Sequence, residues 1–505
     1  MTLTARILRS PATPAVLAFA FVLWGIGVPS FWRDESVSVL AATMPLDELR
    51  ELLDHIDTVH ALYYLLLRPF AAFGGEFAVR LPSALAVAGA TFGVAAIGRK
   101  LAGPRTGAWT GLFAGLVYAM LPMVSRYGQE ARSYALVSAI AVAATWVLLG
   151  ERRSRYAGYG LLVALLGWFH LYALLLLPAH AVTVLRRRGE FLAWLASVVG
   201  AGVLLAPLVY VASGQRDEQL FWLKVPGLPE LAELGVEISG GPVSWQDSGT
   251  PPFFLGLLGL LALLGVWYGM RPRARAAGAA EETGEGTAAR PDRSDRPAEG
   301  TGERSLGAGR LSITAVAVPW AFLPVALSYA ISQVYPVYNP RYVLFVLPAL
   351  ALLAGTGLAA LRRTPVSLTV LAALAVLSAS AQLTVRGPSN RPDDLRTLAA
   401  ELGAQEQQGD AVLYMPERFR LFVAVYGEPY RKLTAFSEKA DRVWLVSRRI
   451  LATEWQTDSR LVELKRSFKK AGETRISGAV RITLYARRLP SKHERPPSAA
   501  RARPS

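Results

Sequence analysis

Residues 14–32 read PAVLAFAFVLWGIGVPSFW, and the chain continues with Arg33-Asp34-Glu35-Ser36. A helix that spans a membrane needs about 20 consecutive apolar residues, so this stretch predicts a first span. Acidic residues at the edge of the hydrocarbon are costly and usually serve a function. They are also compatible with a helix that simply ends in interfacial water. The acidic pair alone therefore leaves both interpretations open.

The composition indicates a polytopic membrane protein with a soluble part, because 52% of the 505 residues are hydrophobic. The first span lacks a small-residue cleavage site, so we expect a retained helix and not a signal peptide. The net charge of +16 is typical of basic cytoplasmic loops in a membrane protein, and we expect no nucleic-acid partner. The chain has no cysteine, which excludes disulfides, thiolate metal sites and cysteine nucleophiles.

The hydrophobic pattern predicts eleven spans. They cover residues 14–32, 78–98, 107–124, 133–150, 156–170, 171–185, 191–212, 253–270, 311–331, 342–361 and 365–384. The run 156–185 is divided at His170 and Tyr172, where we expect a tight turn. Residues 61–73 are too short for a span and contain Arg68-Pro69, so they predict an interfacial or re-entrant helix.

The positions of basic residues predict the orientation. If 61–73 does not cross the membrane, the Arg/Lys clusters at 99–105, 152–155, 186–188, 271–310 and 362–363 all lie on the cytoplasmic side, as positive-inside topology requires. If it does cross, these clusters face outward. We therefore expect the N-terminus inside and the C-terminus outside.

The expected fold is an all-α polytopic membrane protein with a small external α/β domain. It divides into an N-terminal transmembrane catalytic block (1–270) with a long external loop (33–77), a disordered cytoplasmic linker (271–310), further transmembrane helices (311–387), the external domain (388–487) and a disordered tail (488–505). Within the external domain we expect helices near 393–403 and 453–470 and strands near 411–415, 443–446 and 480–485.

This topology brings unusual polar residues to the external face. They come from the first external loop, the start of the second span, the turn after the third, the turn after the fifth and the start of the tenth: Asp34, Glu35, Asp57, His60, Tyr63, Tyr64, Arg80, Arg126, Tyr127, Gln129, Glu130, Arg132, Tyr134, His170, Tyr172, Tyr338 and Arg341 with Tyr342. Taken singly, the arginines also fit snorkelling anchors and the tyrosines an aromatic belt. Arginines that recur beside acids on the side where positive charge is normally avoided indicate a site.

The chemistry that fits this set is sugar transfer from a polyprenyl phosphate. Arginine forms bidentate, charge-assisted hydrogen bonds to phosphate and stabilises its charge as it leaves. A carboxylate removes the proton from the acceptor hydroxyl during attack on the anomeric carbon. One base and a displaced phosphate predict a single inversion.

Five strings resemble the glycosyltransferase C superfamily, specifically its family 39-like bacterial members, which are related to protein O-mannosyltransferases and lipid A aminoarabinose transferases. They are FWRDESVSV (31–39), HALYYLLLRPF (60–70), FAVRLPSALAVAGA (77–90), SRYGQEARSYAL (125–136) and NPRYVLFVLPALALLAG (339–355). The resemblance implies a GT-C-like fold with Asp34 as catalytic base and Glu35 beside it. Two family prolines, expected at Ala61 and Ser133, are absent, which affects local backbone geometry.

The resemblance also implies roles for other residues. Arg341 and Arg132, with Tyr342 and Tyr134, are the expected donor-phosphate ligands, and the site lining is His60, Tyr63, Arg80, Glu130, His170 and Tyr172. Some superfamily members need a divalent cation and others do not, so the metal requirement is left open.

The sequence thus favours an inverting glycosyltransferase in a bacterial plasma membrane, with its active site on the extracytoplasmic face. Its partners are a polyprenyl-phosphate-sugar donor, for which the resemblance favours mannose, an extracytoplasmic protein or glycan acceptor, and the bilayer. The alternatives are a flippase or transporter of a lipid-linked saccharide and a cell-envelope polysaccharide polymerase or ligase. A transporter should carry polar residues at mid-membrane in repeated halves, which this sequence does not display.

The topology is testable with reporter fusions. A reporter placed after Arg310 should be cytoplasmic and one placed after Arg386 should be external, because the basic clusters alternate with acidic loops. Location on the same side of the membrane for both fusions would contradict the predicted orientation.

Overall fold

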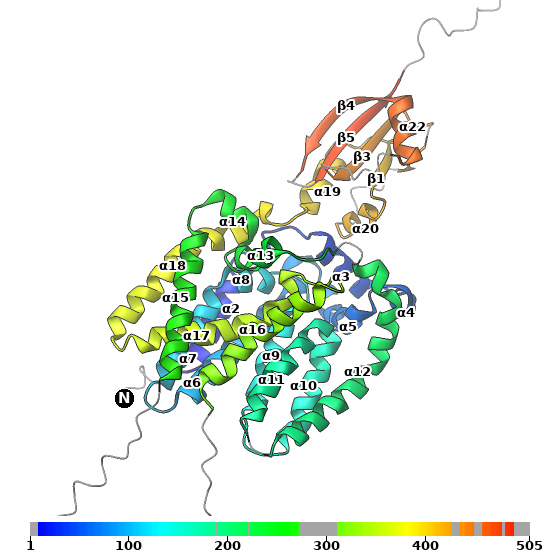
Figure 1. Ribbon diagram of the computed structural model, residues 1–505. Coiled ribbons are helices and arrows are strands. Elements are labelled where there is room, and N and C mark those ends of the chain that lie inside the picture. Colours follow the sequence, from blue (N-terminus) through cyan, green and yellow to red (C-terminus); the bar gives the residue numbers. More distant parts are fainter. Residues whose placement is uncertain are drawn as a thin grey trace, which may run out of the picture.

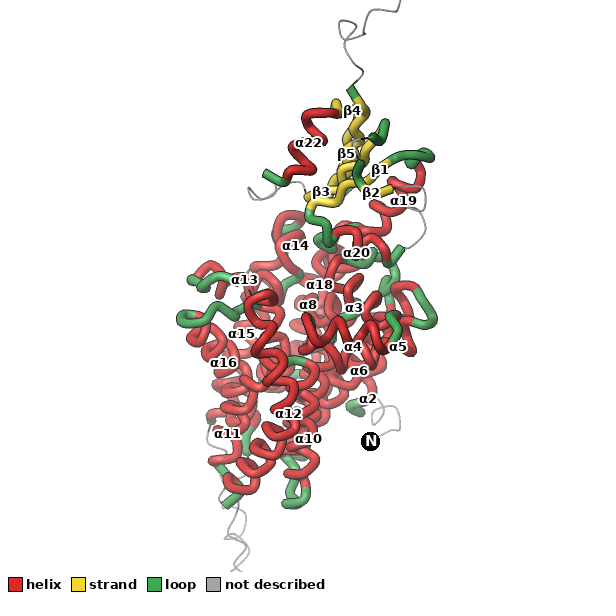
Figure 2. Tube along the Cα trace, turned by 90° about the vertical axis from the view of Figure 1, so that its right-hand side faces the viewer, coloured by secondary structure: helices red, strands yellow, loops and turns green. Residues whose placement is uncertain are grey.

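The computed structural model describes residues 9–187, 189–220, 223–271, 311–426, 434–437, 439–448, 457–476 and 480–488. A large helical part carries a small sheet domain on the end formed by α3 (Arg33–Thr43), α8 (Pro122–Gly128), α13 (Leu228–Ile238) and α14 (Gly241–Asp247) (Figures 1 and 2). The expected fold class, a helical membrane protein with a small C-terminal α/β domain, is confirmed.

Among the described residues, six helices are long and apolar enough to cross a membrane, or seven if α7 (Gly107–Met120) and α8 are counted as one bent span. The six are α6 (Gly75–Ala102), α12 (Phe191–Leu220), α15 (Pro251–Met270), α16 (Ile313–Ser332), η3 (Pro340–Val346) with α17 (Leu347–Ala360), and α18 (Thr364–Arg386). Shorter apolar helices are α2 (Ala12–Leu23), α9 (Tyr134–Leu148), and η2 (Leu171–Leu175) with α11 (Leu176–Leu185). The chain is a multi-pass membrane protein, and the number of eleven spans stays a prediction.

Several of these helices share one core. Buried side chains of α2, α6, α7, α9, α15 and α17 form a continuous cluster. Helices α15 and α17 approach most closely at two glycines. A Cβ added to Gly265 would lie 1.9 Å from the carbonyl oxygen of Leu353, and one added to Gly357 would lie 2.0 Å from that of Leu261. Small residues permit this approach between membrane helices.

Breaks in the helices create the irregular segments at the end of the helical part that carries the sheet domain. Helix α2 ends at Leu23, nine residues before the predicted end of the first span, because Gly25 adopts a positive φ of 75° and Pro29 follows. Helices α7 and α8 meet at Pro122 with a bend of 66°. Helix α10 (Arg155–Phe169) ends at His170, which is extended, as the predicted turn requires.

The predicted external loop, residues 33–77, folds into short helices: α3, α4 (Leu46–His55), η1 (Thr58–His60) and α5 (Ala61–Ala71), followed by the start of α6. With eleven residues α5 rises about 16 Å, too little for a hydrocarbon core of about 30 Å. This length fits the predicted interfacial or re-entrant helix. The sequence analysis assigned no structure to 213–252, where the structure has the end of α12 together with α13 and α14.

The C-terminal domain has one mixed five-stranded sheet in the order β2-β1-β3-β5-β4. Strands β1 (Ala411–Met415), β2 (Thr434–Ala435) and β3 (Arg442–Arg448) are parallel, while β4 (Phe468–Arg475) and β5 (Val480–Arg487) are antiparallel to their neighbours. The helices are η4 (Pro388–Asn390), α19 (Leu395–Gln405), α20 (Phe419–Ala424) and α22 (Ser459–Ser467).

The three predicted strands correspond to β1, β3 and β5, and the helix near 393–403 corresponds to α19. The helix expected at 453–470 is partly wrong, since α22 ends at Ser467 and β4 begins at Phe468. Strand β4 forms by pairing with β5, a contact that the local sequence does not reveal. The expected linker, except Arg271, and the expected tail, except Arg488, lie outside the described residues.

Candidate active site

The two adjacent acids occupy the first turn of α3, where carboxylates favourably face the positive end of the helix dipole. Neighbouring positions on a helix point in directions about 100° apart. The Asp34 side chain is therefore 31% exposed, whereas that of Glu35 is completely buried. The structure gives the two acids different surroundings and hence different chemistry.

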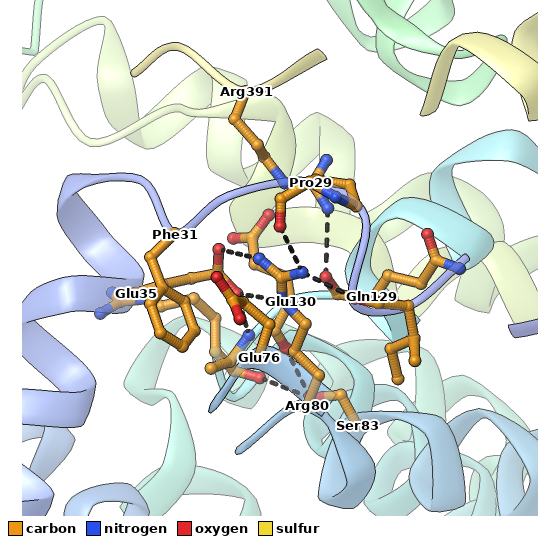
Figure 3. A network of polar contacts seen from close by, with 12 residues as sticks. Pro29, Phe31, Glu35, Glu76, Arg80, Ser83, Gln129, Glu130 and Arg391 are labelled. Carbon is orange, nitrogen blue, oxygen red and sulfur yellow. Dashed lines mark hydrogen bonds and ion pairs between the residues drawn. The ribbon is translucent and has the colours of Figure 1, made fainter. Parts of the chain in front are cut away.

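Glu35 forms a buried ion pair with Arg80 of α6 (Figure 3). Its two oxygens each accept a hydrogen bond of 2.8 Å from Arg80, and Oε1 also accepts one of 2.8 Å from the backbone N–H of Ala131. Arg80 donates its remaining N–H groups to carbonyl oxygens of Ile26, Pro29 and Ser30. Arg80 is thus buried and fully used by the protein, so it holds α3, α6 and the 26–30 turn together instead of presenting a donor to substrate.

Asp34 instead faces Arg341. Its Oδ2 atom lies 3.5 Å from Nη1 of Arg341, and the two side chains are 31% and 29% exposed. The Arg341 guanidinium also lies 5.3 Å from the centre of the Trp32 ring, a cation–π arrangement. Asn339 fixes the start of η3 by accepting a hydrogen bond from the backbone N–H of Arg341. An accessible carboxylate and an accessible guanidinium therefore meet at one place.

Arg132 lies on the other side of Asp34. It donates hydrogen bonds to the Asp34 carbonyl oxygen at 3.5 Å, to Ser38 Oγ at 3.3 Å and to His60 Nε2 at 3.1 Å. All three acceptors are neutral, so no carboxylate among the described residues forms an ion pair with Arg132. Because arginine only donates, Nε2 of His60 accepts and its ring proton lies on Nδ1. Burial, and then Arg132, lower the pKa of His60 well below its usual value, which keeps the ring neutral.

An aromatic cluster around His170 extends the site. The ring of His170 lies 5.9 Å from Tyr134, 6.1 Å from Tyr172 and 5.1 Å from Tyr342. Tyr172 and Tyr342 are themselves 5.4 Å apart. The structure therefore brings together these four predicted residues from the start of α9, the α10–η2 turn and η3. Tyr63 is 1% exposed and lies in the core.

Glu130 follows α8 and is completely buried. Neither of its carboxylate oxygens receives a hydrogen bond from the part of the chain that the structure describes. Burial raises the pKa of the Glu130 carboxyl, the positive charges of Arg391 and other arginines lower it, and the negative charge of Glu35 raises it. Figure 3 shows its side chain close to the Glu35–Arg80 pair. A buried carboxylate without hydrogen bonds is costly, which marks Glu130 as a functional candidate.

Asp57 is a further candidate, which the sequence predicted among the gathered polar residues without a specific role. It is a non-glycine residue with a positive φ of 62°, a conformation that is often retained at functional sites. Its Oδ2 atom accepts a hydrogen bond of 3.3 Å from Tyr64. Burial raises the pKa of Asp57, while the charge of Arg132 opposes that rise. Its position just before His60 was the available signal in the sequence.

The described residues contain no group of three or more His, Asp or Glu placed to hold a metal ion. The possible divalent cation is therefore given no ligand set here.

The sequence matches no family model and no curated protein. The fold resembles two crystal structures of ArnT from Cupriavidus metallidurans. The one bound to undecaprenyl phosphate has a TM-score of 0.54 at 13% identity, over 96% of this chain and 98% of that chain. The apo structure has the same TM-score and identity, over 94% and 97%. The chain shares the fold of these structures over nearly its whole length.

The different surroundings of the two acids lead to a stability prediction. Glu35→Gln should destabilise the protein by about 3–5 kcal/mol, because it leaves the buried Arg80 without its counter-charge. Asp34→Asn is the matched control and should change stability little, since its partner is exposed. Thermal unfolding of both variants in detergent checks this, and equal midpoints for the two variants would contradict the assignment.

Proposed function

We propose that this chain is an inverting glycosyltransferase that moves a sugar from a polyprenyl-phosphate donor to an extracytoplasmic acceptor. The observation that carries the proposal is the accessible Asp34–Arg341 pair. It places a potential base next to a potential phosphate ligand at the irregular end of a membrane bundle. The likeness to ArnT, which was crystallised with undecaprenyl phosphate, supports the same class of lipid partner.

In the proposed reaction, the hydroxyl oxygen of the acceptor attacks the anomeric carbon while Asp34 accepts the proton of that hydroxyl. The bond between that carbon and the phosphate oxygen breaks, and polyprenyl phosphate leaves with the electron pair. Arg341 and Arg132 bind the phosphate and stabilise its growing negative charge. Arg132 suits this task because its hydrogen-bond acceptors in the protein are neutral.

The other residues take supporting roles in this proposal. Tyr134 and Tyr342 flank the phosphate, and His60, His170, Tyr172 and Glu130 line the sugar and acceptor region. Tyr63 is buried, so it supports the residues that line the site and is not itself exposed to substrate. Glu35 and Arg80 position α3 and make no contact with substrate. We place the active site on the extracytoplasmic face of a bacterial plasma membrane, as the predicted topology requires.

The sugar and acceptor are the least constrained parts of the proposal. Mannose, favoured by the sequence resemblance, is the first sugar to test, followed by other polyprenyl-phosphate sugars with the same purified protein. A flippase would move the labelled lipid across a vesicle membrane without breaking its phosphate–sugar bond. A polymerase or ligase would need a lipid-linked chain as donor or acceptor. Release of polyprenyl phosphate together with a glycosylated small acceptor favours the transferase.

Asp34→Asn should lower single-turnover transfer by about 100-fold or more, since the amide cannot accept the proton, while donor binding persists. The matched control is Asp54→Asn, which removes an exposed acid of α4. The assay uses purified, detergent-solubilised variants that still bind donor. Near-normal transfer by Asp34→Asn would exclude this residue as the base.

Arg341→Ala should weaken donor binding by about 1.5–3 kcal/mol, or about 10- to 100-fold, because a charged hydrogen bond to phosphate is lost. Arg341→Lys should recover part of the loss, since it keeps the charge without the bidentate fork. Arg50→Ala on the exposed face of α4 is the control. Donor titration by equilibrium binding measures the effect, and unchanged affinity in folded Arg341→Ala would make this residue a simple membrane anchor.

A further inference from the structure

The connection between α18 and α19, residues 386–396, reaches back to the turn that precedes Asp34. Arg386 donates hydrogen bonds of 2.8 and 3.0 Å to the carbonyl oxygens of Phe21 and Trp24. Arg396 donates to the carbonyl oxygens of Gly27 and Val28 and forms an ion pair of 2.6 Å with Glu76. Arg391, also seen in Figure 3, donates to the carbonyl oxygen of Gln129. The connection thus binds both backbone segments that lead into the candidate site.

The strongest of these contacts involves the residue next to Asp34. Asp393 is completely buried and accepts two hydrogen bonds from the Arg33 guanidinium, at 2.8 Å to Nε and 3.2 Å to Nη2. The backbone N–H of Arg33 is a third donor, at 3.4 Å. Two parallel bonds between a guanidinium and a carboxylate fix orientation as well as distance. The first residue of α3 is therefore held by a side chain of the C-terminal connection.

The C-terminal domain holds the same helix at two further points. The Tyr426 hydroxyl accepts a hydrogen bond of 2.7 Å from the backbone N–H of Phe31 and donates one of 2.5 Å to Glu76. Val37 of α3 packs against the apolar core that α19 and α20 share with the sheet. Figure 2 shows the sheet domain, with α20, directly above α3. These contacts make the domain part of the support of α3.

The supported segment also carries the candidate catalytic groups. The Trp32 ring lies 5.3 Å from the Arg341 guanidinium, and Asp34 lies 3.5 Å from Nη1 of the same guanidinium. Arg33 stands between these two residues in the sequence and points to Asp393. Any rotation of the first turn of α3 would therefore move Trp32 and Asp34 together, relative to an arginine that belongs to η3.

We propose that Asp393 is a positioning residue, which sets the direction of Asp34 through Arg33 and so makes the C-terminal domain a working part of the active site. The proposal rests on the proposed function of Asp34. Its physical basis is separate, because Asp393 touches neither Asp34 nor Arg341 and its own hydrogen bonds connect it to Arg33.

Hydrogen–deuterium exchange of the full-length protein tests whether Asp393 orders α3, the structural half of the proposal, and it requires no activity assay. Asp393→Asn should speed exchange of the amides in residues 31–40 by about tenfold, the factor that corresponds to about 1.4 kcal/mol. Asp394→Asn is the matched control: it changes the adjacent acid, which instead caps α19 through Thr397, and should leave residues 31–40 unchanged. Equal exchange in both variants would overturn the proposal.

Transfer kinetics test whether Asp393 positions Asp34 for catalysis, the functional half of the proposal. Asp393→Asn should lower kcat about tenfold while the donor KM stays within twofold, since the phosphate ligands Arg341 and Arg132 lie elsewhere. Arg33→Gln should have the same effect, and the double variant should be no worse than the more damaging single one. Asp393→Glu should restore part of kcat. Additive losses, or a loss in donor KM alone, would overturn the positioning role.

The two halves separate this inference from the proposed function. If the unmodified protein transfers no sugar, the proposed function fails, while the exchange experiment still decides whether Asp393 orders α3. If transfer occurs and Asp393→Asn behaves like Asp394→Asn in both experiments, the positioning role fails and the proposed function stands.

Discussion

The buried ion pair between Glu35 and Arg80 is the interaction on which the candidate-site end of the helical part depends. Transfer of two charges out of water costs several kcal/mol for each ion, and only good geometry and further hydrogen bonds offset this cost. Here the carboxylate accepts from Arg80 and from Ala131, while the guanidinium also donates to three carbonyl groups of the 26–30 turn. The pair thereby ties α3, α6, the turn after α2 and the turn after α8 to one point.

This arrangement explains why two neighbouring acids do not share one task. The helical turn directs the Glu35 side chain into the core, whereas the Asp34 side chain stays partly exposed. Of the two acids, only Asp34 is accessible to a substrate. The buried acid fixes the helix on which the accessible acid stands. Opposite roles for adjacent carboxylates follow from their direction on the helix and from their partners, and not from any difference in their intrinsic acidity.

Features with local causes were predictable from the sequence. Apolar runs located the long helices, and the predicted turn at His170 is a real break, whereas the bend at Pro122 inside the predicted span 107–124 was missed. The strands β1, β3 and β5 followed from short β-branched runs. The acid pair, Arg341 and Arg132 were chosen as candidates because charges at that position in a membrane protein are unusual, and the structure brings Asp34, Arg341 and Arg132 together. These predictions needed only the period of the pattern and the cost of charge near hydrocarbon.

Features that depend on distant partners were missed. The sequence analysis placed Arg80 at the substrate, although its donors are all used by the protein. It ended the first span at Trp32, although Gly25 and Pro29 are local signals of an earlier break, and it could not reveal that Arg386 and Arg396 bind the backbone between Phe21 and Val28. It overlooked β4, which needs β5, and the contact of Arg33 with Asp393, which lies 360 positions away in the chain. Such pairs become visible only when the fold brings them together.

The charges at the candidate site also suggest an order of events for the proposed reaction. Arg132 has only neutral hydrogen-bond acceptors, and Arg341 faces Asp34 at 3.5 Å, a distance longer than a strong charged hydrogen bond. In the proposed mechanism the donor phosphate first meets Arg132, which forms no ion pair with a carboxylate of the described residues, and then takes Arg341 away from Asp34. The carboxylate that loses its partner becomes free to accept the acceptor's proton at the moment when the donor is in place. Phosphate binding and activation of the base are thereby linked through one arginine, so a bound donor would prepare Asp34 to accept the proton of the attacking acceptor hydroxyl.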